Sequence, residues 1–443
     1  MNTYSKFYFL ICLLALACNC KAQEFCKTIA MATATHGKLI TKTATGYVIV
    51  GESSNNNYTR KEVLVYTTNK NGIVLQATTY GGNESYAIND FRMNANGGIT
   101  LLAERYLKKR ESLLLMNIDS VANVLQAVPY DENGAEVEPY AVVQTNVGDN
   151  IIVGFTKLIT PIEGGFYTAN KEDQYFYVLK TNVKGNKLWS KYIDFGAGST
   201  SAATSIIKTS ATEFIIVGYC IKNKVGETVI VKINDAGNVL WSKRIVGSMQ
   251  NFKTLTLLSN NTIALVGTKQ TTKNNTTISI TNLNLNGNLL WAKTYGGIYS
   301  SSARGVSSNK QGIILTGITQ TSTKGTNKVC VLNINYNGLL NWANTYNTGT
   351  FNNVSNPVLD KEYIVFTGLT YGDSAGVKSI LCKYKNEFKK ERNVVFKTSI
   401  NTIQLIPYKL QFTPLNQPIF AGTYTPKDTK VAKVILKSTD IKF

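Results

Sequence analysis

The fold of this 443-residue chain is decided by a stretch near its middle, SAATSIIKTSATEFIIVGYC at residues 201–220, continued by ETVIVKINDAGNVLWSKRI at residues 227–245. Two similar stretches follow it. One reads NFKTLTLLSNNTIALVGTKQ and TISITNLNLNGNLLWAKTY within residues 251–295, and the other reads ARGVSSNKQGIILTGITQ and KVCVLNINYNGLLNWANTY within residues 303–346. Self-similarity at a period of about 20–50 residues is typical of repeat folds. The chain is therefore predicted to repeat one structural unit.

Two anchor positions extend this repeat outward. The first is a small residue that closes the second strand-like run of each copy, at Gly51, Ala103, Gly154, Gly218, Gly267, Gly317, Gly368 and Gly422. The second is a Gly followed four residues later by a Trp, at Gly185 and Trp189, Gly237 and Trp241, Gly287 and Trp291, and Gly338 and Trp342. Copies 1, 2 and 7 have Gln76, Gln126 and Arg392 at the Trp position. The spacings of 49 to 64 residues between first anchors predict about eight copies of roughly 50 residues.

Each copy contains four short runs rich in Val, Ile, Thr, Tyr and Phe, separated by turns such as NKNG, NDAG and NLNG. This pattern is typical of antiparallel hairpins. A four-stranded sheet of this length cannot bury both faces alone, so radial packing of the copies is the best solution. We predict an all-β chain with one β-propeller domain over residues 23–443, with eight four-stranded blades, or seven as the alternative.

Two details of the ring are also predicted. The Trp of the second anchor, at the start of the fourth strand, is expected to pack its ring on a neighbouring blade. The small residue at this anchor suits sheets that approach closely. Copy 8 ends at Phe443 without a fourth strand of its own, so we expect residues 25–31 to supply it and close the ring.

The N-terminus resembles an export signal. Lys6 precedes an apolar run over residues 7–17, and Ala22 precedes Gln23. We predict a signal peptide over residues 1–22, cleaved before Gln23, and a secreted, periplasmic or cell-envelope location. Lipid attachment at Cys18 is a less favoured alternative. No stretch approaches the ~18 apolar residues that a membrane helix requires, so we predict no transmembrane segment.

Charge and cysteine content narrow the classes of function. The chain has a formal net charge of +20, which favours anionic partners. Nucleic acid is electrostatically possible, but export makes it an unexpected ligand. Outside the signal segment only Cys26, Cys220, Cys330 and Cys382 remain, and their spacings suggest no disulfide.

The Gly-x-x-x-Trp pattern, with a Tyr-Gly-Gly turn at residues 80–82 and 295–297, resembles the repeats of secreted Bacteroidota β-propellers of the quinoprotein-like and WD40-like superfamily. The resemblance implies a fold and little about function. Quinone-dependent members commonly carry an adjacent cysteine pair, which this chain lacks. The Asp-box of sialidase propellers places Gly three residues before Trp, whereas here the separation is four. We therefore predict no cofactor.

Catalytic motifs are scarce. His36 is the single histidine, which argues against a His-based triad or metal cage, and beside Gly37 it is expected to be a turn or surface residue. The acidic pairs Asp131 and Glu132, Glu136 and Glu138, and Glu172 and Asp173 are expected in solvated loops. We predict no catalytic residue and no metal site, although two loop carboxylates are all that a glycosidase needs.

A binding surface is the stronger hypothesis. The connections between the second and third strands, hereafter the 2–3 connections, share one face of a propeller and vary most in length, as binding loops do. The longest, over residues 157–174, belongs to copy 3. If these connections converge around one mouth of the ring, they form a basic rim with nearby aromatic residues. The predicted binding residues are Arg105, Lys108, Lys109, Arg110, Phe166 and Tyr167.

These features predict a non-catalytic binding or scaffold module at the cell envelope or outside the cell, with a protein or an anionic glycan as partner. Two alternatives remain open. One is an enzyme that acts on polysaccharide through loop carboxylates, and the other is a lipoprotein that helps to assemble outer-membrane proteins. The ligand, the partner and the oligomeric state do not follow from the residues.

Overall fold

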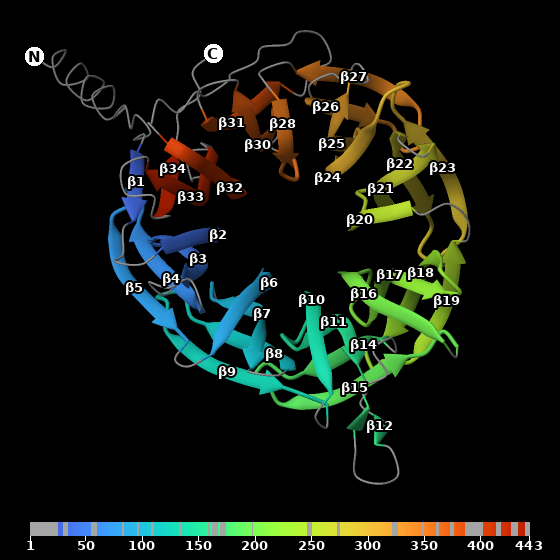
Figure 1. Ribbon diagram of the computed structural model, residues 1–443, viewed down its shortest axis with the longest axis horizontal. Coiled ribbons are helices and arrows are strands. Elements are labelled where there is room, and N and C mark those ends of the chain that lie inside the picture. The colour runs from blue at the N-terminus through green and yellow to red at the C-terminus, as the bar shows by residue number, and fades with distance from the viewer. Residues whose placement is uncertain are drawn as a thin grey trace, which may run out of the picture.

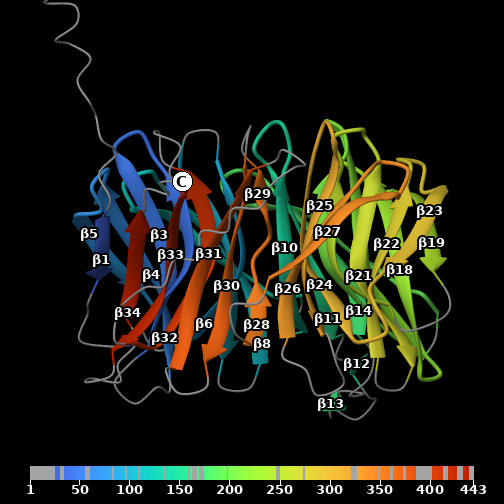
Figure 2. The same cartoon turned by 90° about the horizontal axis from the view of Figure 1, so that it is seen from above.

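The computed structural model of the chain is an all-β ring, shown down its axis in Figure 1 and from the side in Figure 2. It describes residues 25–29, 34–54, 60–81, 84–94, 97–107, 110–132, 135–157, 160–161, 167–168, 174–196, 198–245, 250–272, 275–320, 327–346, 350–359, 363–372, 376–385, 402–412, 418–426 and 433–438. The predicted signal peptide and Cys18 lie outside these residues. Within them we find no helix with the length and hydrophobicity needed to cross a membrane.

Eight four-stranded sheets make up the described part of the ring, which confirms the predicted β-propeller. Blades 1 to 4 contain β2 (Ala34–Lys42), β3 (Gly46–Ser54), β4 (Lys61–Asn69) and β5 (Val74–Tyr80); β6 (Ser85–Met93), β7 (Ile99–Leu107), β8 (Arg110–Ile118) and β9 (Val124–Tyr130); β10 (Glu136–Gln144), β11 (Asn150–Lys157), β14 (Gln174–Thr181) and β15 (Lys187–Ile193); and β16 (Ser199–Lys208), β17 (Glu213–Lys222), β18 (Val225–Asn234) and β19 (Val239–Ile245).

Blades 5 to 8 contain β20 (Gln250–Leu257), β21 (Ile263–Thr272), β22 (Asn275–Leu283) and β23 (Leu289–Tyr295); β24 (Ser301–Asn309), β25 (Gly312–Gln320), β26 (Asn327–Ile334) and β27 (Leu340–Tyr346); β28 (Thr350–Val354), β29 (Val358–Leu359), β30 (Tyr363–Gly372) and β31 (Gly376–Lys385); and β32 (Thr402–Phe412), β33 (Pro418–Pro426), β34 (Lys433–Ser438) and β1 (Phe25–Ile29). The first strand of each blade lies toward the centre of the ring in Figure 1.

Blade 8 closes the ring as predicted. Its outermost strand is β1, which pairs antiparallel with β34 so that Phe25 lies opposite Ser438 and Ile29 lies opposite Val434. The N-terminal strand thus completes a sheet whose other three strands come from the C-terminal end. The two ends of the chain are joined by backbone hydrogen bonds.

The hydrophobic core is divided into layers between successive blades. Leu102 and Leu113 of blade 2, for example, pack with Val142 and Ile152 of blade 3, and all four are buried. Similar clusters join blade 3 to blade 4 and blade 5 to blade 6. The described clusters bury blades 2 to 6 on both faces, each against two neighbours, which is why one blade could not be stable alone.

A β-bulge in the innermost strand explains the first anchor. In seven blades the inner strand skips one residue next to the anchor, as between Ala203 and Ser205 opposite Gly218. The bulge presses the inner strand onto the anchor, and a Cβ on Gly218 would overlap the carbonyl oxygen of Ala202. A small residue is required there because the backbones approach so closely.

The second anchor lies at a contact between successive blades. The turn before Trp241 places Gly237 at φ +74°, where glycine is strongly favoured, and Asn234 Oδ1 accepts hydrogen bonds from the backbone N–H groups of Ala236 and Asn238. The ring of Trp189, in the preceding blade, covers Gly237 so closely that a Cβ on Gly237 would lie 2.8 Å from the nearest ring atom. In blade 2, which has no Trp, Gln126 takes the same place against Gly185.

Candidate functional site

Of the predicted rim residues, Arg105 is the one whose side chain is described, and it is already engaged. Its guanidinium donates hydrogen bonds to both carboxylate oxygens of Glu84, and Tyr86 donates another to Glu84 at 2.7 Å. The Glu84 carboxylate raises the pKa of Arg105. Lys108, Lys109 and Phe166 lie outside the described residues. Arg110 begins β8 and Tyr167 begins β13, but their side chains are not among those described.

The long 2–3 connection of blade 3 does not lead toward the centre of the ring. Its two short strands, β12 (Thr160–Pro161) and β13 (Tyr167–Thr168), pair as a hairpin. β12 lies outside the circumference in Figure 1, and the hairpin extends beyond one end of the ring in Figure 2. Strands 2 and 3 sit midway along the radius of a blade, so a paired extension of them can project outward. Tyr167 therefore belongs to a peripheral projection rather than to the central mouth.

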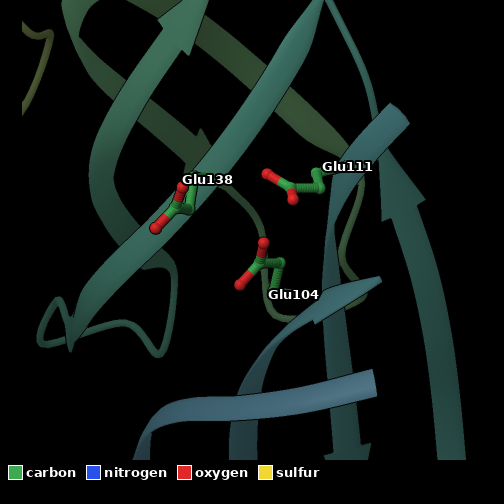
Figure 3. A group of neighbouring side chains, drawn as sticks. All are labelled: Glu104, Glu111 and Glu138. Atoms are coloured by element: carbon green, nitrogen blue, oxygen red, sulfur yellow. The ribbon is translucent and has the colours of Figure 1, made fainter. Parts of the chain in front are cut away.

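A cluster of three glutamates, which the sequence did not predict, lies where blades 2 and 3 meet. Glu104 comes from β7, Glu111 from β8 and Glu138 from β10, and oxygen atoms of their carboxylates lie within 4.8 Å of one another. Figure 3 shows the three side chains converging from separate strands. The expectation that Glu136 and Glu138 lie in a loop is wrong, because both belong to β10. Glu172 and Asp173 lie outside the described residues.

Burial governs the protonation of this cluster. Glu104 is 6% exposed, and burial, with a further contribution from the Glu138 and Glu111 charges, raises its pKa to about 7. The Tyr106 hydroxyl donates a hydrogen bond to Glu104 at 2.8 Å and opposes this shift. Burial also raises the pKa of Glu138. Carboxylates this close can share protons or ligate a hard cation.

Glu52 provides a natural comparison for Glu104. Each residue follows the first anchor of its blade, and each is buried. Glu52 faces Lys38 and Lys61, both at 3.6 Å, and accepts a hydrogen bond of 3.0 Å from the backbone N–H of Ile88 in the next blade. The residue that corresponds to Ile88 in blade 3 is Pro139, which has no N–H.

A second, differently charged region covers blades 5 and 6. Residues 236–359 contain no Asp or Glu, although they contribute ten Lys and Arg residues. This segment forms both blades, together with β19 of blade 4 and the two strands β28 and β29 of blade 7. The acidic cluster and this cationic sector thus belong to different parts of the ring.

A polar cavity of about 230 Å³ opens between blades 5 and 6 within this sector. Hydroxyl and amide groups line most of it, from Thr276, Ser300, Ser301, Ser302, Gln320 and Asn327. Arg304 and Ile318 complete the lining. Thr276, Gln320 and Asn327 lie beside the 2–3 connections of the two blades, and Ser300, Ser301 and Ser302 lie at the connection from blade 5 to blade 6. Because these connections share one face of the ring, the cavity lies on the face that was predicted to bind. Its position and its Arg304 were not predicted.

The histidine and the described cysteines do not form a reactive site. His36 lies within β2, opposite Glu52 of β3 in the sheet, and is therefore not in the turn that was one expectation. Burial lowers the pKa of His36. Cys220 and Cys330 are buried free thiols, and burial raises the pKa of Cys330 to about 12, so its reactive thiolate is suppressed. The side chains of Cys26 and Cys382 are not among those described.

Comparison with known proteins informs the fold alone. No family model matches the chain, and no curated protein matches its sequence. Among solved structures, it is similar to the WD40 domain of SCAP from fission yeast, at 9% identity and a TM-score of 0.46, over 94% of each chain. It is also similar to the β-propeller domain of the Trilobed protease from Pyrococcus furiosus, at 9% identity and a TM-score of 0.41, over 93% of this chain and 96% of that one.

A third similar structure is that of a hydrolase. Puromycin hydrolase matches at 9% identity and a TM-score of 0.48, over 88% of this chain and 58% of that one. A fold alone does not assign a function.

Proposed function

We propose that the protein is a non-catalytic binding module for anionic partners, either glycans or acidic protein surfaces, at the cell envelope or outside the cell. The observation that carries the proposal is the acid-free segment 236–359. Two complete blades are built without a carboxylate, so their lysines and arginines have no acidic partner within the segment. A surface with one sign of charge attracts and concentrates ligands of the other sign.

The propeller supports this role physically. Its blades are locked by buried layers, while the 2–3 connections and the strand ends beside them are free to vary. Binding residues placed on such a scaffold keep their positions without an ordering cost at the time of binding. Lys269 on β21 and Lys328 on β26 both lie beside 2–3 connections in the cationic sector.

The experiment compares two double variants of equal charge change. Lys269→Gln with Lys328→Gln removes two cations from the proposed face. Lys70→Gln with Lys310→Gln removes two exposed cations from turns on the opposite face. We expect the first pair to weaken binding to an anionic polysaccharide by about tenfold, measured by calorimetry at low salt, and the second pair to change it little. Equal effects would contradict the assignment of the face.

The acidic cluster favours one second candidate, an enzyme that acts on polysaccharide. Glycosidases use two carboxylates, of which one has a raised pKa and serves as the acid. Glu104 has such a pKa, and Glu138 and Glu111 are its neighbours. The candidate requires that hydrolysis of a polysaccharide be lost in both Glu104→Gln and Glu138→Gln. Hydrolysis that survives both substitutions would remove it.

A further inference from the structure

The polar cavity between blades 5 and 6 contains a cation with no counter-charge. Arg304 lines the cavity, and its Nε atom is buried without a hydrogen-bond partner. Among the described residues, Arg304 forms no ion pair. The nearest acidic residues along the chain are Asp235 and Asp360, and neither belongs to blade 5 or blade 6. A buried polar group of this kind is costly unless something satisfies it.

Blade 1 shows how the same place in the repeat is neutralised within the protein. Lys38 is the residue skipped at the inner-strand bulge, and Glu52, which follows the anchor Gly51, lies 3.6 Å from its ammonium group. Arg304 is the residue skipped at the bulge of blade 6. The residue that follows the anchor Gly317 is Ile318, and it lines the cavity beside Arg304. Blade 6 keeps the cation and has an aliphatic side chain where blade 1 has the carboxylate.

We propose that this cavity binds a hexuronate unit of an acidic oligosaccharide, with the sugar carboxylate paired to Arg304. The inference rests on the proposed function and names its ligand class. A guanidinium matches a carboxylate in charge and geometry. The surrounding hydroxyl and amide groups, from Thr276, Ser302, Gln320 and Asn327 among others, suit the hydroxyls of a sugar ring.

The size of the cavity supports a single sugar unit. Its volume of about 230 Å³ lies below the roughly 300–1,000 Å³ of sites for drug-sized ligands. The rest of an oligosaccharide would extend over the face of the sector, where Lys269 and Lys328 lie. Thr276, Ser300 and Ser301 already form hydrogen bonds within the protein, so the hydroxyl of Ser302 and the amides of Gln320 and Asn327 are the groups offered to a ligand. An extended acidic peptide supplies carboxylates without ring hydroxyls and matches these groups less well than a sugar ring does.

The test measures binding of tetragalacturonate by calorimetry, with the fully methyl-esterified tetramer as a neutral ligand of the same shape. We expect the acid to bind and the ester to bind at least tenfold more weakly. Arg304→Gln removes the cation, and Ile318→Glu places a carboxylate where blade 1 has Glu52. Both variants are expected to lose at least tenfold in affinity, whereas Lys310→Gln, an equal charge change on the opposite face, is expected to bind as the unaltered protein does.

The possible outcomes separate the two proposals. If tetragalacturonate binds equally to the unaltered protein and to Arg304→Gln, the cavity is not the site, although an anion-binding sector remains. Tighter binding of oligoglutamate than of tetragalacturonate would overturn the sugar assignment. If no anionic ligand binds, the proposed function fails as well. Should Ile318→Glu not fold, Arg304→Gln decides the question, because a partly buried Arg whose Nε has no partner can be replaced at little cost to the fold.

Discussion

Glu104 and Glu52 occupy the same place in two successive blades, yet their surroundings differ in sign. Glu52 lies between two lysines and accepts an N–H donor, whereas Glu104 lies beside two carboxylates. The raised pKa of Glu104 means that the folded protein holds this proton more tightly than the unfolded chain does. The stability that the proton provides is complete below the unfolded pKa and is lost as the pH rises through about 7.

The stability lost when Glu104 ionises can be measured with the variant Glu104→Gln. Glu104→Gln carries no charge at any pH, so we expect it to be more stable than the unaltered protein above pH 7, by about 1–3 kcal/mol, and equally stable near pH 4. Urea unfolding midpoints at pH 4 and pH 8.5 measure the difference. The matched change Glu52→Gln removes two ion pairs and should destabilise at pH 8.5. A Glu104→Gln protein that is less stable at pH 8.5 would contradict the assignment.

Pro139 explains part of the contrast between the two glutamates. At the place where Ile88 donates its N–H to Glu52, blade 3 has a residue that cannot donate. We predict that Pro139→Ala supplies this donor and lowers the pKa of Glu104, because a hydrogen bond to the ionised form favours that form. A carboxyl NMR titration measures it. The same titration of Pro161→Ala, which alters a proline of the peripheral hairpin, should leave the pKa of Glu104 where it was.

The contact between a Trp and the turn of the next blade occurs three times in succession, at Gly237, Gly287 and Gly338. Trp189 covers Gly237, and Lys191 reaches over the Trp ring to donate hydrogen bonds to Ala236 O and Asn238 Oδ1, both at 3.1 Å. One blade further on, Trp241 covers Gly287 and Lys243 lies over the Trp241 ring and donates a hydrogen bond of 2.9 Å to Asn288 Oδ1. The outer strand of each of these blades therefore holds the turn of its neighbour.

Gly237 and Gly198 allow the steric cost of an added Cβ to be measured apart from the cost of a left-handed backbone. Gly237 and Gly198 have φ values of +74° and +72°, but a Cβ on Gly198 would meet nothing within 4 Å. We predict that Gly198→Ala costs about 1 kcal/mol from the left-handed backbone alone, and that Gly237→Ala costs about 1–3 kcal/mol more because the Trp189 ring must move. Urea unfolding measures both. Equal losses would show that the ring contact is unimportant.

What was predictable from the sequence follows from how local each feature is. The Gly237 turn and Trp241 lie within one hairpin, and both recur in every regular copy, so their roles could be predicted. Glu104, Glu111 and Glu138 come from three strands of two blades, and no spacing in the chain brings them together. The cationic sector did leave a signal, since the absence of Asp and Glu from residues 236–359 can be read directly from the sequence. The pairing of β1 with β34 was predictable because copy 8 lacked a strand.

At the scale of the whole molecule, ring closure depends on five residues. β1 has β34 as its sheet partner, and without it β34 becomes an exposed edge. We predict that deletion of residues 25–29 lowers the thermal midpoint by several degrees and promotes association, which calorimetry and light scattering would detect. Replacement of residues 25–29 by threonines keeps a strand-forming backbone and should restore most of the stability. A deletion that left both measurements unchanged would show that β1 does not hold the ring closed.

The same pairing sets an order of assembly. Phe25 can pair only after Ser438 has been synthesised, so blade 8 is completed last. Domains form from the N-terminus as a chain is made, and contacts of long sequence separation form slowly. Blades 1 to 7 can therefore stack while synthesis continues, but the circle stays open until the final strand arrives. We therefore expect a chain truncated before β34 to leave the ring open and to expose apolar blade surface, which is the kind of surface that chaperones and proteases act on.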